Sequence, residues 1–147
     1  MLNFLRYTHA LLSAWRSAEK GDWDGVQKWL SKLSFLTGRK TPSLNVPVEL
    51  NLLYLQSSYF LDDGDDAKIC ARVVIDQILN NNLGKNSPDS MYIAEFAKNF
   101  LNAFADRFLD LSDSFRAMSD EIPESRGSHQ GVDLNLIRRF PIHRHVR

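Results

Sequence analysis

The chain has 147 residues, the length of one ordinary domain, which is enough to bury a hydrophobic core. Its apolar content of 44% and aromatic content of 11% exclude a chain that is disordered throughout. No apolar run approaches the roughly 20 residues of a membrane span. The first residues lack the pattern of a secretory leader, and the single cysteine, Cys70, cannot form an internal disulfide, so we expect a cytoplasmic protein that does not enter a membrane.

The formal net charge is zero, but the charges are unevenly distributed. Residues 1–125 carry 13 Lys and Arg against 17 Asp and Glu, whereas residues 126–147 carry five Arg against one acid. An acidic body is thus followed by a short basic tail. The tail can dock on its own body, on an acidic partner or on nucleic acid, and its charge is too small to favour nucleic acid strongly.

Apolar residues at helical spacing predict four consecutive helices in the first 81 residues. The third of these is nearly apolar and should be the most enclosed element of the fold. The fourth contains the β-branched run Val73-Val74-Ile75, but its length and the helical spacing on both sides favour a helix over a strand. The expected ranges are 3–20, 23–37, 48–61 and 66–81.

Two Gly-Asp pairs, Gly21-Asp22 and Gly64-Asp65, separate these helices into hairpins. Glycine can adopt the left-handed conformation that ends a helix, and aspartate can accept the free N–H groups of the next helix. Both pairs therefore predict that the chain turns back on itself. We expect stacked antiparallel helix pairs, an architecture that mostly serves to bind other proteins.

A fifth helix is expected to start near Ser87 and to reach Met118, a length of roughly 45 Å at 1.5 Å per residue. Phenylalanine recurs in it every four residues, a spacing that makes the aromatic stripe wind around a 3.6-residue helix. If part of this helix is uncovered, the excess aromatic area favours a homodimer through it. The stripe consists of Phe96, Phe100, Phe104 and Phe108, continued by Leu111 and Phe115.

These patterns predict an all-α fold of about five antiparallel helices, arranged in a bundle or a stack of hairpins, with an irregular C-terminal tail. The predicted divisions are a helical domain at 1–118, a flexible linker at 119–131 and a basic tail at 132–147. The tail alternates apolar and polar residues at 132–136 but also suits one helical turn, so the sequence leaves open whether it is extended or helical.

The turn Lys20-Gly21-Asp22-Trp23 resembles the turn inside a tetratricopeptide repeat, a family with a period of about 34 residues. The resemblance covers at most residues 2–82. The two Gly-Asp pairs lie 43 residues apart, and Val26 and Ile69 stand where that family prefers alanine. The resemblance implies a stack of α-hairpins with a groove for a peptide or a helix.

No group of residues has the spacing of a catalytic, cofactor-binding or metal site. The acidic run 62–66 lacks the Glu at position twelve that a helical calcium loop needs, because Val73 or Val74 stands there. It is better interpreted as a capped turn between helices. Cys70 lies on an apolar helix face, where a thiol packs as a small hydrophobe. We therefore expect no cofactor and no enzymatic activity.

The candidate partner-binding residues are aromatic and basic side chains of the kinds that dominate protein interfaces. The preferred hypothesis is a non-enzymatic protein–protein interaction module: an adaptor, a chaperone-like protein or a neutralising partner that binds a peptide or helix in a helical groove. The alternative is a nucleic-acid-associated regulator that uses the basic tail. The candidates are Trp23, Trp29, Arg138, Arg139 and Phe140.

Overall fold

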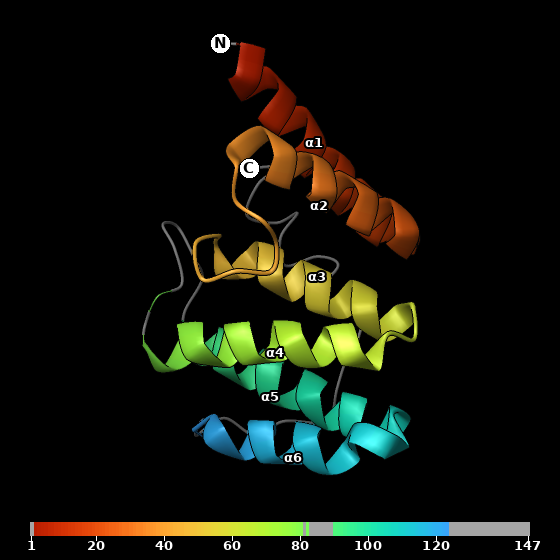
Figure 1. Cartoon of the computed structure of the whole chain (residues 1–147), viewed down its shortest axis with the longest axis vertical. Coiled ribbons are helices and arrows are strands. Elements are labelled where there is room, and N and C mark those ends of the chain that lie inside the picture. The colour runs from red at the N-terminus through yellow and green to blue at the C-terminus, as the bar shows by residue number, and fades with distance from the viewer. Residues whose placement is uncertain (1, 81, 83–89, 124–147) are drawn as a thin grey trace.

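The computed structural model describes residues 2–80, 82 and 90–123, and in this part of the chain all regular structure is helical. The helices succeed one another along the longest axis of the molecule, from α1 and α2 at one end to α6 at the other (Figure 1). The predicted all-α fold is confirmed. The elements are α1 (Leu2–Lys20), α2 (Trp23–Thr37), α3 (Val48–Phe60), α4 (Gly64–Leu79), α5 (Ser90–Arg107), the 3-10 helix η1 (Leu109–Leu111) and α6 (Ser112–Glu121).

The first hairpin turns where the sequence predicts it. Gly21 has a φ of 77°, in the left-handed region, and the N–H of Asp22 reaches back to the carbonyl of Ser17 over 2.8 Å. The Asp22 carboxylate then accepts from the N–H of Gly25 at 3.0 Å and caps α2. A left-handed residue ends one helix and an aspartate begins the next, as helix capping requires.

The second turn uses the same backbone geometry, but not the residues that the sequence predicts. Asp62, with a φ of 60°, takes the left-handed position, and Asp63 caps α4 by accepting from the N–H of Asp66 at 3.1 Å. The N–H of Asp63 bonds the carbonyl of Ser58 over 2.9 Å, the counterpart of the bond between Asp22 and Ser17. Aspartate is one of the few residues that tolerate this conformation. The turn therefore repeats 41 residues after Gly21, not 43.

Gly64 is the first residue of α4, and its lack of a side chain serves packing rather than the turn. A Cβ there would lie 3.0 Å from Cδ1 of Leu111 and 3.2 Å from the Phe108 ring. The glycine therefore lets the chain between α5 and α6 approach the start of α4 closely.

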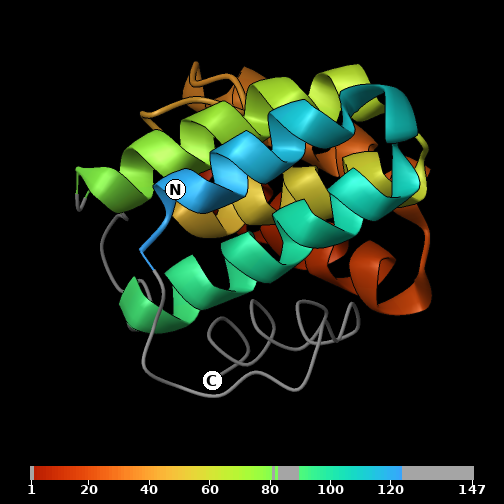
Figure 2. The same ribbon diagram turned by 90° about the horizontal axis from the view of Figure 1, so that it is seen from below.

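The prediction of a single fifth helix that reaches Met118 is wrong. The helix ends at Arg107, Phe108 is non-helical with φ −102° and ψ 83°, and η1 leads into α6. The two helices pack on each other, and α6 lies between α4 and α5 when the molecule is seen from below (Figure 2). Folding back brings Phe115 onto Phe104, with ring centroids 5.1 Å apart and planes 19° apart. Burial of these two aromatic rings against each other stabilises the folded-back chain more than a continuous helix would be stabilised.

The aromatic stripe of the predicted fifth helix is part of the core. Phe100, Phe104 and Phe115 are at most 1% exposed, and Phe96 is 8% exposed. Phe108 and Leu111 are only partly buried, so part of the stripe stays accessible and the homodimer through this helix remains a prediction.

The helical body also extends past the predicted domain end at Met118. Helix α6 continues to Glu121, and Ile122 is only 1% exposed. The Lys98 ammonium group of α5 donates to the carbonyls of Ser119 and Ile122 at 2.7 Å and 3.2 Å, which satisfies the end of α6. Residues 119–121 therefore belong to the body and not to the predicted linker, and residues 124–147 lie outside the described part.

Helix α3 joins two hydrophobic clusters, one with α1 and α2 and one with α4, α5 and α6. Ten of its 13 residues are buried, which confirms the prediction that it is the most enclosed helix. Tyr59, near its end, contacts Phe100 and Phe104 edge-on with ring centroids 5.4 Å and 5.1 Å away. The helices form three hairpins, α1 with α2, α3 with α4 and α5 with α6, and α3 in the second hairpin packs on both of the others.

Candidate interaction surface

The two tryptophans proposed as partner-binding residues lie in different surroundings. Trp23 is only 7% exposed and stacks on Phe60 of α3, with ring centroids 4.7 Å apart and planes 6° apart. It packs the core between the first and second hairpins. Trp29 is half-buried, and its ring packs edge to face with the His9 ring, with the centroids 5.3 Å apart. The other three candidates, Arg138, Arg139 and Phe140, lie outside the described residues.

Trp29 borders a cationic and aromatic surface on the outer side of α2, which we call the α2 patch: Lys28, Trp29, Lys32 and Phe35. The ammonium groups of Lys28 and Lys32 lie 6.0 Å and 5.4 Å from the centroid of the Trp29 ring. At these distances the face of an indole attracts a cation. Two like charges four residues apart on a helix repel each other, so the patch holds a positive potential that an anionic partner relieves.

Phe35 is the most exposed large apolar side chain in the described residues, at 86%. It follows Lys28 and Lys32 at positions i+7 and i+3, so all three lie on the helix face opposite the buried Val26, Leu30 and Leu33. This helix face therefore combines an exposed apolar side chain with two cations, which makes it a candidate binding surface.

Charge is divided between the two ends of the molecule. Residues 2–40, which form the first hairpin and the start of the following loop, contain seven Lys and Arg against three acids, a net charge of +4. Residues 41–82 and 90–123 together contain five Lys and Arg against 12 acids, a net charge of −7. Because α1 and α2 lie at one end of the long axis, the stack has a basic end and an acidic remainder (Figure 1).

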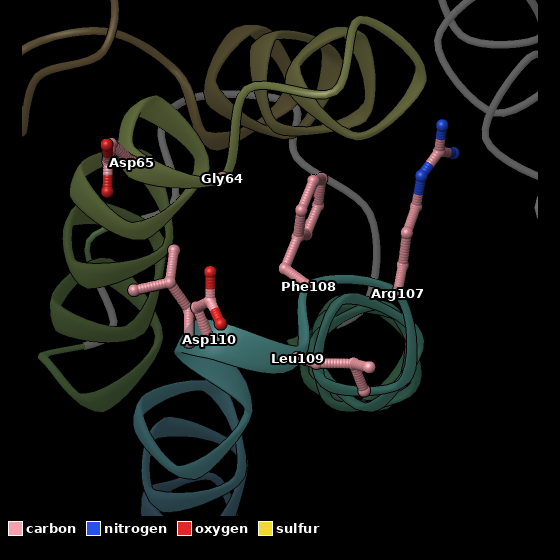
Figure 3. A pocket seen from close by; sticks show the side chains of 7 residues that line it. Gly64, Asp65, Arg107, Phe108, Leu109 and Asp110 are labelled. Atoms are coloured by element: carbon pink, nitrogen blue, oxygen red, sulfur yellow. The ribbon is translucent and has the colours of Figure 1, made fainter.

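A hollow of about 520 Å³ opens where the second turn meets the junction between α5 and α6. We call it the junction hollow; Figure 3 shows Phe108 between Gly64 and Arg107. Leu109 is 78% exposed at its rim, and the carboxylates of Asp65 and Asp110 are exposed as well. The lining residues are Gly64, Asp65, Arg107, Phe108, Leu109, Asp110 and Leu111.

Arg107 also lines the hollow, but its charge is paired with the Asp62 carboxylate. Its Nε and Nη2 atoms lie 2.9 Å and 2.8 Å from Oδ1 of Asp62. Its guanidinium carbon also lies 4.6 Å from the centroid of the Tyr59 ring. An arginine held by a carboxylate and an aromatic face has a fixed orientation. The other charges of the lining are the exposed carboxylates of Asp65 and Asp110, which take part in none of the ion pairs between described residues.

The remaining reactive side chains have structural surroundings. Cys70 is fully buried, as the sequence predicts, and burial raises the pKa of its thiol. Its Sγ donates to the Asn51 carbonyl at 3.1 Å. Asp63 caps α4, in agreement with the capped-turn interpretation of the acidic run 62–66. Within the described residues no three His, Cys, Asp or Glu side chains come together to hold a metal ion.

None of the helices in residues 2–80 and 90–123 combines the length and apolar character that crossing a membrane requires. No family model, curated protein or solved structure matches the chain. The resemblance to tetratricopeptide repeats therefore stays a prediction, and the turn recurs after 41 residues, not after the family's period of about 34.

Sequence reasoning missed the centre of the α2 patch. The sequence-based candidates include Trp29 but neither Phe35 nor the two lysines on its helix face. The available signal was the position of Phe35, which falls outside the apolar stripe of α2 and in line with two lysines.

Proposed function

We propose that this protein is a non-enzymatic interaction module that binds an acidic partner protein through the α2 patch. The observation that carries the proposal is the exposure of Phe35, at 86%, on the same face of α2 as Lys28 and Lys32. An exposed apolar anchor on a helix face that also carries two cations suits a partner that offers an apolar pocket with carboxylates near it.

The position of the first hairpin in the stack supports the same proposal. The helices stack along the long axis, and the first hairpin lies at one end of the stack, where the outer face of α2 carries the exposed Phe35. A preformed helix face loses little conformational entropy on binding. Adaptors, chaperone-like proteins and neutralising partners all need a surface of this kind.

Position-specific cross-linking tests the proposal. A photo-reactive amino acid placed at Phe35 of the full chain is irradiated in a lysate of the protein's own source. The same residue placed at Ile69, which is 63% exposed on α4, is the matched control. We expect one acidic protein to be cross-linked from position 35 and not from position 69. High salt should weaken the capture, because exposed charges are screened beyond roughly 8–10 Å.

The lysines are tested by the double variant Lys28→Glu/Lys32→Glu, which should abolish the adduct formed from position 35. The single change Lys68→Glu, at an exposed lysine on α4, should leave it intact. Equal adducts from positions 35 and 69, or an adduct that survives the double charge reversal, would contradict the proposal. An adduct that nuclease treatment removes would favour the nucleic-acid alternative instead.

A further inference from the structure

The α2 patch and the junction hollow complement each other, although they lie on different parts of the molecule. The patch presents the exposed phenyl ring of Phe35, with Lys32 one turn and Lys28 two turns before it on the same helix face. The hollow, of about 520 Å³, has Phe108, Leu109 and Leu111 in its lining and two carboxylates, Asp65 and Asp110, at its rim. Its volume lies within the range of about 300–1,000 Å³ that is usual for sites that enclose a bound group.

The charges of both surfaces are available for a contact between molecules. The four ion pairs between described residues use Arg72, Arg107 and Arg116 as their cations. Lys28 and Lys32 take part in none of these pairs, and neither do Asp65 and Asp110. The Phe35 ring in the hollow would therefore bring Lys32, one turn away on the same face, toward two carboxylates that take part in none of these pairs.

The two surfaces cannot meet within one molecule. Helix α2 lies toward one end of the long axis, and the junction between α5 and α6 lies toward the other (Figure 1). The complement of the patch is thus reached only on a second copy. A contact between two different surfaces of identical chains is heterologous, and it continues from copy to copy until a ring closes or a filament forms.

We propose that this protein associates head to tail with copies of itself, with Phe35 of one copy inserted into the junction hollow of the next. The inference rests on the proposed role of the α2 patch and names a second copy as its occupant. One inserted side chain and a few ion pairs form a small interface, below the roughly 1,200 Å² of a standard complex. Association is therefore weak and is strongest at low salt.

Sedimentation velocity on the full chain measures this association. The average mass of the wild type should rise between about 10 μM and about 1 mM protein, the range that brackets a weak interface. The rise should be larger at about 50 mM salt than at about 500 mM salt, because salt screens exposed charges. A wild type that stays monomeric up to about 1 mM at low salt would overturn the proposal.

Two variants block one surface each. Lys32→Ser/Phe35→Ser removes the α2 patch, which we call the head, and Asp65→Lys/Asp110→Lys replaces the two carboxylates of the junction hollow with cations. Each variant alone should remain monomeric at all concentrations. A mixture of the two has one intact head and one intact hollow and should form a one-to-one dimer that cannot grow further. Growth beyond a dimer in the mixture, or a mixture that stays monomeric, would contradict a head-to-tail contact between these two surfaces.

The matched control, Lys68→Ser/Ile69→Ser, removes an exposed lysine and an exposed apolar side chain from α4. It should associate as the wild type does, and circular dichroism should show equal helix content in all variants. A monomeric protein that still cross-links an acidic partner from position 35 would overturn only the self-association. A protein that associates with itself and captures no partner would overturn only the proposed function.

Discussion

Asn51 donates a hydrogen bond from Nδ2 to Oε1 of Gln77 over 2.8 Å, and both side chains are at most 1% exposed. The two amides also hold the loop that connects α2 to α3. Asn51 Nδ2 donates to the Ser43 carbonyl at 2.9 Å, and Gln77 Nε2 donates to the Val46 carbonyl at 2.8 Å. Because buried amides are stable only when they are hydrogen-bonded, this network fixes the loop against α3 and α4.

Replacing Asn51→Ala should lower the free energy of unfolding by about 2–4 kcal/mol, since it leaves buried acceptors without donors. Urea unfolding followed by circular dichroism measures the change. Asn45→Ala, at an exposed position of the same loop, should stay within about 0.5 kcal/mol of the wild type. A cost as small as that of the control would show that the network does not stabilise the fold.

The backbone of the second turn predicts different outcomes for two changes of Asp62. Asp62→Ala should cost about 1–2 kcal/mol, because alanine is strained at a φ of 60°. Asp62→Asn keeps a residue that tolerates this conformation and loses only an exposed ion pair with Arg107, so it should cost less than about 1 kcal/mol. Equal costs, measured by urea unfolding, would mean that the ion pair and not the backbone decides the effect.

The packing of Gly64 predicts that Gly64→Ala destabilises the fold by about 1–3 kcal/mol, because the new methyl group would lie 3.0 Å from the Leu111 side chain. A double-mutant cycle with Leu111→Ala isolates this contact. The two changes together should cost less than the sum of the single changes. Strict additivity would show that the crowding arises elsewhere.

The raised pKa of Tyr54 predicts that the fold loses stability in alkaline solution. Burial, followed by the hydrogen bond that its hydroxyl donates to Asp66, raises the pKa of Tyr54 above its ordinary value of 10.0. In the unfolded chain the pKa returns to about 10. The folded state therefore keeps the neutral phenol longer, and the stability that this contributes is present in full below about pH 10 and is lost as the pH rises further.

The variant Tyr54→Phe tests this contribution. At neutral pH it should be less stable than the wild type by about 1–2 kcal/mol, because it loses a hydrogen bond to a carboxylate. The difference should shrink above about pH 10, where the wild type loses the contribution of the phenol. Urea unfolding of both proteins across this range measures the difference, and a constant difference would contradict the raised pKa of Tyr54.

Much of the fold follows from local signals in the sequence. Gly21 and Asp22 end one helix and begin the next because only a few residue types stabilise these positions, and the apolar spacing locates α1 to α4 within two residues of their observed ends. The second turn is misplaced by two residues because Asp62 can take the role of glycine, and a run of four acids around one glycine hides which of them does so.

The break at Phe108 and the α2 patch depend on contacts between distant residues. No glycine or proline marks the end of α5, and the chain bends there because Phe115 packs on Phe104. Phe35 is exposed because α2 turns its opposite face to the core. The spacing of Lys28, Lys32 and Phe35 was visible in the sequence, but only the packing of α2 shows that this face is the open one.

The choice of aspartate over glycine at the second corner has a consequence for the third hairpin. A glycine at position 62 would turn the backbone equally well and offer nothing beyond it, whereas the Asp62 carboxylate extends to Arg107 at the end of α5. One residue thereby turns the backbone and also links the second turn to α5. The ion pair at this turn helps to set the orientation of α5 and α6 relative to α3 and α4. Lengthening or shortening the turn would therefore rotate α5 and α6 relative to the helices before them.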